Sequence, residues 1–319
     1  MKIVIKQLIL LLFFVSFGLQ ASPQFDKIYV FGDSLSDNGN LASIVGPLPN
    51  PPYFGSARAS NGLVALEVMA SRFGLTLEPS LHLIGPAQGT NYAVIAAKVG
   101  RNEPQDLATQ VALFLANHGG AAPENALYVM FIGGNDIRHA RDSGNRAFAQ
   151  QYLTDAANTI ATQIQVLNLA GAKNWLVVQA PDLGRIPETQ LIANAFGLPG
   201  LPAQTTELTE YFNDALHQQV DNIEEANDIE IEEFKLFKKF NKIIDKAAKF
   251  GFSNTSEPCF SSEQGIYTPG CNFGFNIDQY IFFDEIHPTA RIHAIIGEMM
   301  YRQVRDEDDE QKEGSDKDD

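Results

Sequence analysis

The apolar residues of the chain fall into two kinds of run, and the short runs are continuous. Three of these runs consist largely of consecutive aliphatic and aromatic residues, and a fourth, weaker run is interrupted by acidic residues. They span residues 27–32, 127–134, 174–181 and 228–237. Continuous runs of this length are typical of strands buried on both faces, as in a parallel sheet covered by helices.

The longer segments between these runs carry apolar residues at helical spacing. Several start with a capping residue and end at Gly, and they begin at Asn61, Asp106, Ala147 and Thr206. Because strands and helices alternate along the chain, the pattern predicts an α/β domain with a central parallel sheet.

The first residues depart from this pattern. A basic start at Lys2 is followed by an apolar run of about fifteen residues, which ends in small and polar residues near Ala21. This arrangement predicts a secretory signal peptide over residues 1–21, and therefore a secreted protein that is periplasmic or extracellular. An N-terminal membrane anchor is the less favoured interpretation, because a membrane-spanning helix needs roughly twenty apolar residues.

The chain is acidic, with a formal net charge of -16 at pH 7. Nucleic acid is therefore not an expected partner, because phosphate backbones are bound by basic surfaces. Part of the acid lies in residues 305–319, where nine acidic residues stand with three basic ones and no apolar side chain. This composition predicts a disordered, solvated tail, so the folded domain is expected to span residues 22–304.

Polar segments follow three of the predicted strands. In open α/β sheets, ligands bind beyond the carboxyl ends of the strands, so these segments mark the expected site. They read GDSLSDNGN, GGND and APDLG, in chain order. A further segment near the C-terminus, FFDEIHPT, supplies an acid and a histidine three residues apart.

Ser34, His287 and Asp284 offer the three groups of a nucleophilic catalyst. A serine hydroxyl attacks well when a histidine takes its proton and an acid orients that histidine. The tetrahedral intermediate of acyl transfer also needs hydrogen-bond donors for its oxyanion, and the Asn135 amide and the Ser34 backbone N–H are candidates. Taken singly, a helix-capping serine, a turn asparagine and a surface Asp–His pair are the alternative interpretations.

The blocks FGDSLSDNGN, GTNYAV, FIGGNDI and FFDEIHPT, in this order, resemble those of the GDSL family of lipases and esterases, the SGNH hydrolases. The resemblance extends from Lys27 to Arg302. Within the family, the chain is similar to secreted bacterial lysophospholipase A and to glycerophospholipid:cholesterol acyltransferases. It implies a flavodoxin-like three-layer α/β/α sandwich, with Ser34 as the nucleophile and Asp284 and His287 as its partners.

The resemblance also implies an oxyanion hole formed by the Ser34 N–H, a backbone N–H of the second block and the Asn135 amide. Where relatives usually carry glycines, this chain has Ile95 and Ala96. Alanine keeps the N–H donor, so Ala96 is expected to complete the hole if its backbone reaches the required angles. A positive φ would be costly for alanine.

Together these features predict a secreted serine hydrolase that cleaves fatty-acyl esters of lysophospholipids or phospholipids through an acyl-enzyme. Transfer of the acyl group to a sterol is a second outcome that the resemblance allows. No cofactor and no metal are implied. Two alternatives stay open: a carboxylesterase acting on short-chain or acetylated-sugar esters, and a lipid- or glycan-binding module on an inactive hydrolase scaffold.

The cysteines of the chain, Cys259 and Cys271, lie close together in a segment rich in Gly, Pro and Ser. In an exported protein such a pair predicts a disulfide that closes a surface loop. A zinc site is disfavoured, because two thiols without a nearby histidine pair fall short of four ligands. The loop is interpreted either as a cover that a processing protease removes or as a stabilising staple.

Residues 233–252 form a basic island in this acidic chain. On a helix, Phe237, Phe240 and Ile244 share one side while six lysines spread over the rest. The favoured interpretation is a helix packed on the sheet with a solvated lysine face. The alternative is a transient contact with an anionic membrane surface.

Overall fold

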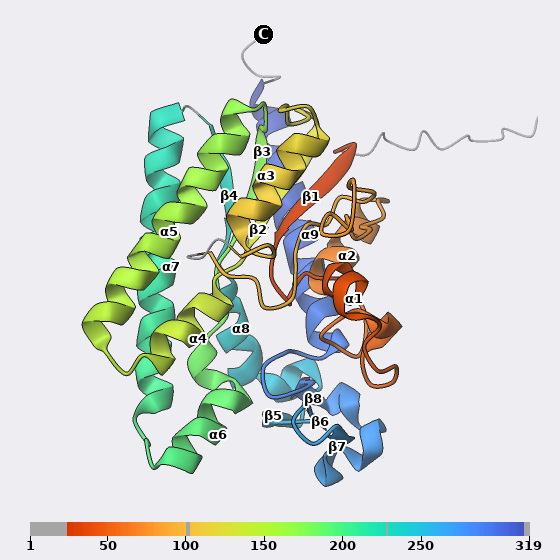
Figure 1. The fold of residues 1–319 in the computed structure, drawn as a ribbon, viewed down its shortest axis with the longest axis vertical. Coiled ribbons are helices and arrows are strands. Elements are labelled where there is room, and N and C mark those ends of the chain that lie inside the picture. Colours follow the sequence, from red (N-terminus) through yellow and green to blue (C-terminus); the bar gives the residue numbers. More distant parts are fainter. Residues whose placement is uncertain (1–23, 100–102, 228, 316–319) are drawn as a thin grey trace, which may run out of the picture.

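The computed structural model describes residues 24–99, 103–227 and 229–315 (Figure 1). The predicted signal peptide, residues 1–21, lies outside the described residues. Among the helices that are described, none is both long enough and apolar enough to cross a membrane.

Within the described residues, four parallel strands form the central sheet. They lie side by side in chain order: β1 (Lys27–Gly32), β2 (Ala126–Phe131), β3 (Asn174–Val178) and β4 (Ile231–Phe234). An extended segment, residues 90–94, runs along the other edge of β1. Its Tyr92 N–H donates to the Val30 carbonyl at 2.7 Å, and its Val94 N–H donates to the Gly32 carbonyl at 3.1 Å. The parallel sheet predicted from the apolar runs is confirmed.

The second strand is shorter than its apolar run, for a reason that bears on the site. β2 ends at Phe131 because Gly133 turns the chain with a φ of 127°. A β-carbon at Gly133 would lie 2.4 Å from the Phe212 ring. Glycine therefore meets both a backbone and a packing requirement at the point where the chain leaves the sheet.

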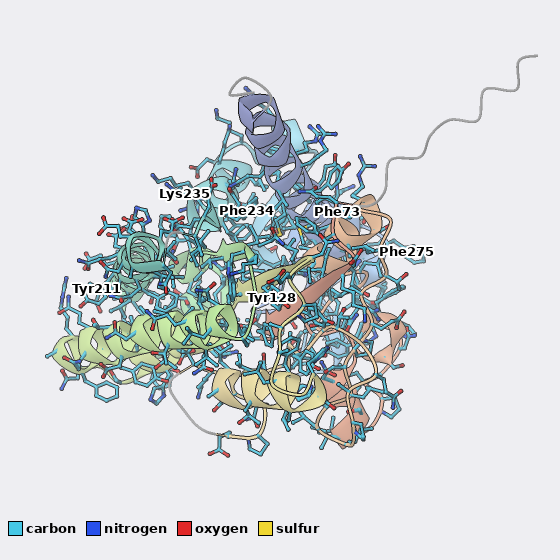
Figure 2. All side chains as sticks on the ribbon, turned by 90° about the horizontal axis from the view of Figure 1, so that it is seen from above. Phe73, Tyr128, Tyr211, Phe234, Lys235 and Phe275 are labelled. Carbon is cyan, nitrogen blue, oxygen red and sulfur yellow. A yellow bond between two sulfur atoms is a disulfide. The ribbon has the colours of Figure 1, made fainter. Side chains whose placement is uncertain are left out.

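The helices cover both faces of the sheet. They are α1 (Asn40–Val45), α2 (Ala65–Arg72), α3 (Leu107–Asn117), α4 (Gly134–Asp142), α5 (Arg146–Leu169), α6 (Pro187–Phe196), α7 (Leu201–Asn227), α8 (Leu236–Asp245) and α9 (Ala290–Ser315). Helices α3, α5 and α7 lie on one face, and α2 and α9 lie on the other, as Figure 2 shows from above. This is the predicted three-layer sandwich.

Aromatic side chains fill the layer between the sheet and α3. Tyr29 packs edge-on against Phe114 of α3 at 4.9 Å between ring centroids and stacks on Tyr128 of the neighbouring strand at 5.6 Å. Phe31 contacts Phe114 as well, at 5.5 Å. Such pairs add roughly 0.5–1.5 kcal/mol each to the stabilisation from burial, so this cluster fixes β1 and the turn that follows it.

The region between α8 and α9 is built from short elements. They are the 3-10 turns η3 (Ala247–Phe250), η4 (Pro269–Gly274) and η5 (Ile277–Gln279) and the strands β5 (Asn254–Pro258), β6 (Phe260–Ser261), β7 (Ile266–Tyr267) and β8 (Tyr280–Phe282). Earlier in the chain, η1 (Phe54–Ser56) and η2 (Leu183–Arg185) are short turns of the same kind. β5 pairs with β8, and β6 and β7 form an antiparallel hairpin.

The last helix extends beyond residue 304, where the sequence predicted the folded domain to end. α9 continues to Ser315, through most of residues 305–319, for which composition predicted a disordered tail. Glu, Gln, Lys and Arg lose little free energy in a helix. A polar segment is not expected to pack into a core. It can still continue a helix whose earlier turns are packed in the core.

Candidate active site

Ser34 lies in a tight turn directly after β1. The Asp33 carbonyl accepts hydrogen bonds from the Ser36 and Asp37 N–H groups at 3.1 and 3.0 Å, and the Asp33 carboxylate accepts one from the Leu35 N–H at 3.0 Å. These bonds hold the turn closed around Ser34, whose side chain is buried. The GDSLSDNGN segment is thus a turn that presents a serine at the carboxyl end of a buried strand.

Asp37 anchors this turn to the neighbouring loop. Its carboxylate accepts hydrogen bonds from the backbone N–H groups of Gly39, Asn40, Leu41 and Ile95, at 2.8–3.1 Å. Burial raises the pKa of this carboxyl, and the four N–H donors oppose that rise. Asp37 therefore joins the Ser34 turn to the segment that carries Ala96.

The structure brings Ser34, His287 and Asp284 into one hydrogen-bonded line. The Ser34 Oγ atom lies 2.9 Å from His287 Nε2. The other ring nitrogen, Nδ1, lies 2.8 and 3.0 Å from the two carboxylate oxygens of Asp284. The line has the order nucleophile, base and orienting acid that activates a serine hydroxyl.

The loop after β8 is shaped by Asp284 itself. The carboxylate accepts hydrogen bonds from the backbone N–H groups of Ile286 and His287 at 2.8 and 2.7 Å. The Phe283 N–H donates to the His287 carbonyl at 2.8 Å and closes the loop. A spacing of three residues thus lets the acid bond to the backbone and the ring of one histidine.

The charges around His287 favour its protonated form. Burial alone would lower the pKa of the imidazole, but the charge and hydrogen bond of Asp284 outweigh burial, so the pKa is raised above its ordinary value. Burial raises the pKa of the neighbouring Asp33 carboxyl to about 6, against its hydrogen bond with Leu35 and the charge of His287. A proton on His287 would therefore be stabilised by the adjacent Asp284 carboxylate.

Of the other candidate oxyanion donors, Asn135 lines the same pocket as Ser34, and Ala96 follows Ile95, which is bonded to the Ser34 turn. Asn135 is in the first turn of α4, and its Nδ2 atom donates to the Ala97 carbonyl at 3.0 Å. Ala96 lies between Ala97 and the anchored Ile95, is exposed, and has a φ of 68°. Among the described residues, neither the Ser34 N–H nor the Ala96 N–H has a protein acceptor. Within the described residues, the fold therefore does not use either of these two donors.

The backbone at Ala96 has a positive φ, which glycine adopts more easily than alanine. The residue takes the left-handed conformation at a cost of roughly 1–2 kcal/mol. The hydrogen bonds of Ile95 to Asp37 and of Ala97 to Asn135 hold the chain on either side of it. The strain is thus maintained by contacts of the site itself.

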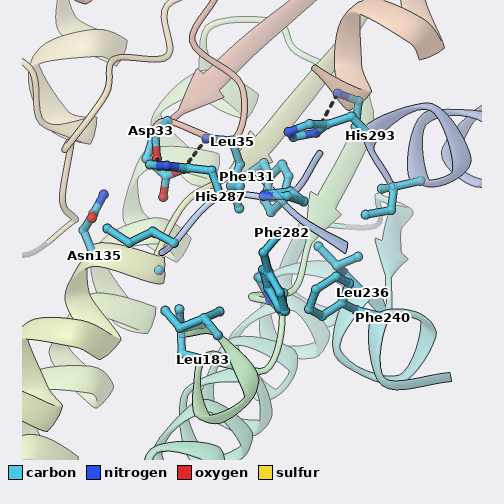
Figure 3. A pocket seen from close by; sticks show the side chains of 18 of the residues that line it. Asp33, Leu35, Phe131, Asn135, Leu183, Leu236, Phe240, Phe282, His287 and His293 are labelled. Atoms are coloured by element: carbon cyan, nitrogen blue, oxygen red, sulfur yellow. Dashed lines mark hydrogen bonds between the residues drawn. The ribbon is translucent and has the colours of Figure 1, made fainter. Parts of the chain in front are cut away.

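An apolar pocket extends inward from Ser34 and His287 (Figure 3). It contains about 660 Å³ of empty space, part of it open to solvent. Its lining includes Ser34, Asn135 and His287 at one end, and Figure 3 shows apolar side chains from several elements around the remainder. Those used below are Phe131, Leu183, Leu236, Phe240, Phe282 and Ile296.

Two residues of one ion pair beside the pocket, Arg138 and Glu188, were not recognised in the sequence. Arg138 of α4 lines the pocket, and its guanidinium contacts both the Asn135 side chain and Glu188 of α6. Neither residue belongs to a recognisable motif. In the segment before Glu188, Leu183 and Ile186 line the pocket as well. The remaining pocket histidine, His293, is buried with a pKa lowered to about 3 by burial.

Cys259 and Cys271 form a disulfide in the structure. The loop between them does not contribute to the described lining of the pocket. Instead, the Cys259 and Phe260 N–H groups donate to the carbonyls of Phe282 and Phe283 at 3.2 and 2.8 Å. The disulfide loop thus supports the strand that leads into the Asp284–His287 loop.

The chain is similar to known proteins over most of its length. Residues 28–300 match the model of the GDSL-like Lipase/Acylhydrolase family. The chain is 26% identical over 345 residues to the phosphatidylcholine-sterol acyltransferase of Aeromonas hydrophila, covering 92% of this chain and 95% of that protein. It is 25% identical over 338 residues to the GDSL esterase/lipase At1g29660 of Arabidopsis thaliana, covering 93% of each. An acetylxylan esterase structure from Geobacillus stearothermophilus aligns with a TM-score of 0.46 at 12% identity, covering 89% of this chain and 96% of that one.

Proposed function

Because the chain belongs to the GDSL family of lipases and acylhydrolases and is a hydrolase of the esterase/lipase type, we propose that it cleaves fatty-acyl esters of lysophospholipids and phospholipids through an acyl-enzyme on Ser34. The reaction needs a nucleophile, a base, oxyanion donors and a site for the acyl chain. The described geometry offers a candidate for each of these parts.

In the proposed reaction, Ser34 Oγ bonds to the ester carbonyl carbon while its proton passes to His287 Nε2. The carbonyl oxygen becomes an oxyanion that accepts hydrogen bonds from the Ser34 and Ala96 N–H groups and the Asn135 amide. The bond to the glycerol oxygen then breaks, and His287 returns the proton to that oxygen. Water, activated by His287, releases the fatty acid in the second half of the reaction.

The apolar pocket is the observation that carries the proposed substrate class. Its walls include Phe131 from β2, Ile296 from α9, and Leu236 and Phe240 from α8, so an acyl chain bound at Ser34 would contact apolar surface well beyond its carbonyl. Burial of each methylene contributes about 0.8 kcal/mol. An acetyl group would leave most of this surface unused, which favours long acyl chains over acetylated sugars.

The acyl-enzyme has a second possible acceptor. An alcohol that reaches the acyl-enzyme in place of water would take the acyl group by the same steps, and a relative of this chain is named a phosphatidylcholine-sterol acyltransferase. The outcome depends on how well the occupied pocket excludes water and admits the alcohol. Acyl transfer to a sterol is therefore part of the proposal as a side reaction.

The substrate class is tested by comparing kcat/KM for lysophosphatidylcholine with that for p-nitrophenyl esters of increasing chain length. We expect kcat/KM to rise with chain length and lysophosphatidylcholine to be cleaved readily. A preference for the acetyl ester would overturn the lipid proposal and support the short-chain esterase. The control is Ser34→Ala, and absence of fluorophosphonate labelling of the folded wild-type protein would support the inactive binding module instead.

We also propose that α8 makes a transient contact with anionic lipid surfaces. Its inner face supplies Leu236 and Phe240 to the pocket. Lys238 and Lys242 are exposed on the outer face, one helical turn apart, and Lys246, which directly follows the helix, is exposed as well. These three lysines have no ion-pair partner within the residues that the structure describes. Like charges at this spacing destabilise a helix, and an anionic surface would remove that cost.

The surface contact is tested by co-sedimentation with phosphatidylcholine vesicles, with and without phosphatidylglycerol. We expect binding to the anionic vesicles that salt reverses and that Lys238→Gln/Lys242→Gln/Lys246→Gln weakens by about 100-fold. The control is Lys27→Gln/Lys173→Gln, which removes two exposed lysines elsewhere and is compared with Lys238→Gln/Lys242→Gln as well as with the triple variant. Equal binding by both variants would contradict the contact.

Export over residues 1–21 stays a prediction, tested by assaying the protein outside the cytoplasm with and without that segment.

A further inference from the structure

A primary amide presents either an oxygen or an N–H group to its surroundings, depending on which way it is turned. For Asn135 to stabilise an oxyanion, its nitrogen must face the reacting carbonyl, because its oxygen would repel the developing charge. The side chain of Asn135 is held from two sides by protein groups. Those groups decide which end of the amide faces the substrate.

The two contacts of the Asn135 amide are compatible with one orientation. Its Oδ1 atom accepts a hydrogen bond from Arg138 Nη1 at 3.1 Å, and its Nδ2 atom donates to the Ala97 carbonyl at 3.0 Å. A guanidinium donates only, and a carbonyl accepts only. In a flipped amide, the Asn135 nitrogen would face the Arg138 guanidinium, which is also a donor, and the Asn135 oxygen would face the Ala97 carbonyl, which is also an acceptor. The observed orientation leaves one Nδ2 hydrogen for the oxyanion.

Arg138 is itself held in place. Its Nε atom donates to Glu188 Oε2 at 2.8 Å, and its Nη2 atom donates to the other carboxylate oxygen of Glu188. Arg141 adds a second contact to Glu188 at 3.0 Å. The side chains of Arg138 and Glu188 are 26% and 19% exposed, so this two-bond pair is largely shielded from water and restricts the guanidinium to one plane.

Glu188 also reaches the other half of the site. Its backbone N–H donates to the Glu285 carbonyl at 2.7 Å. Glu285 lies between Asp284 and His287, in the loop that carries the acid and the base. One residue at the start of α6 therefore contacts both the guanidinium that holds Asn135 and the loop that holds His287.

From these contacts we infer that Arg138, fixed by Glu188, is the positioning residue of the oxyanion hole: it sets the orientation of the Asn135 amide and does not touch the reacting atoms. The inference rests on the proposed ester chemistry at Ser34 and is independent of the substrate class. Its test uses p-nitrophenyl butyrate and the rate at which a fluorophosphonate labels Ser34, so failure of the lipid proposal leaves it intact.

The first measurement separates kcat from KM. Loss of one oxyanion donor lowers kcat by about 10²–10³-fold, so we expect Arg138→Met to lower kcat by about 10–100-fold while KM changes less than about threefold. Arg138→Lys keeps a donor and recovers part of the loss. The matched control, Arg72→Met, removes an arginine whose ion pair with Glu298 lies on the surface, and it leaves kcat unchanged.

The decisive measurement is a double-mutant cycle with Asn135→Ala. If Arg138 acts through the amide, Arg138→Met costs less than about threefold once Asn135 is already Ala. Equal losses in the two backgrounds would show a role independent of Asn135 and overturn the inference. Should Arg138→Met fail to fold, the same cycle is run with Arg138→Lys and Glu188→Gln, which retain the buried volume. A wild-type protein that fluorophosphonate does not label would instead refute the proposed chemistry.

Discussion

The Nε2 atom of His287 lies 2.9 Å from the Oγ atom of Ser34, although the two residues are 253 positions apart in the chain. Ser34 follows the buried strand β1, and His287 lies in the loop after β8, which Asp284 closes through its own backbone contacts. The contact therefore depends on two separately stabilised loops, and substitutions in either one test it.

Asp284→Asn is expected to lower kcat by two to four orders of magnitude with little loss of stability. An amide oxygen still accepts the Ile286 and His287 N–H groups, but the amide no longer stabilises a protonated imidazole, and it allows the wrong tautomer. Steady-state kinetics and the thermal unfolding midpoint measure the two effects. Asp278→Asn, at an exposed carboxylate nearby, is the control. A loss of less than tenfold would show that Asp284 is not the orienting acid.

The pH dependence of kcat/KM follows from the raised pKa of His287. The base must be neutral to accept the serine proton, and a raised pKa keeps it protonated to higher pH. Activity therefore rises with pH, and the midpoint lies above the ordinary histidine value of 6.5.

Asp33 offers a second test of the same profile. Its charge contributes to the raised pKa of His287, so Asp33→Asn is expected to move the midpoint of the kcat/KM profile to lower pH. Asparagine retains an oxygen for the Leu35 N–H, so the turn is preserved. Asp278→Asn leaves the midpoint in place. A midpoint that stays at its wild-type value in Asp33→Asn would show that Asp33 does not act on the base.

Much of this arrangement was predictable because it is encoded locally. Continuous apolar runs identified β1, β2 and β3, and the family assigned from four short blocks is confirmed. The spacing of Asp284 and His287 was informative because one loop holds both residues. The roles of Ser34, Asp284, His287, Asn135 and Ala96 stay predictions, although the structure places Ser34, His287 and Asn135 at one pocket and Asp284 in contact with His287.

The Arg138–Glu188 pair was not predictable for the opposite reason. The two residues lie on α4 and α6, 50 positions apart, and an arginine or a glutamate on a helix is usually solvated. Their contacts with Asn135 and with the Glu285 carbonyl form only when the two helices pack together in the folded protein. The sequence carries no periodic pattern that would predict a polar contact between residues so far apart in the chain.

Removal of the disulfide by Cys259→Ser/Cys271→Ser is expected to lower the free energy of unfolding by about 2–3 kcal/mol, because a short closed loop constrains the unfolded chain. We also expect kcat to fall, since the loop donates hydrogen bonds to Phe282 and Phe283 beside the catalytic loop. Urea unfolding and kinetics measure both effects, and reduced wild-type protein is the control. A rise in activity after proteolytic cutting between Cys259 and Cys271 would favour a protease-controlled cover over a staple.

Ala96→Gly is expected to stabilise the protein while preserving activity. Ala96 has a φ of 68°, which costs an L-residue roughly 1–2 kcal/mol. Glycine removes that strain at an entropic cost of about 0.5–1 kcal/mol. The net gain of a few tenths to about 1 kcal/mol corresponds to a rise in Tm of a few degrees at most.

A matched control distinguishes strain relief from a general effect of glycine. Ala121 is also exposed and lies in a loop, and it is not among the residues of positive φ. Ala121→Gly should therefore lower Tm where Ala96→Gly raises it. Because both variants keep every backbone N–H, kcat should stay within about threefold of wild type in each. A lower Tm in Ala96→Gly would mean that the strain at Ala96 is compensated by contacts of its methyl group. A large loss of kcat would mean that this methyl group, and not only the N–H, takes part in binding the substrate.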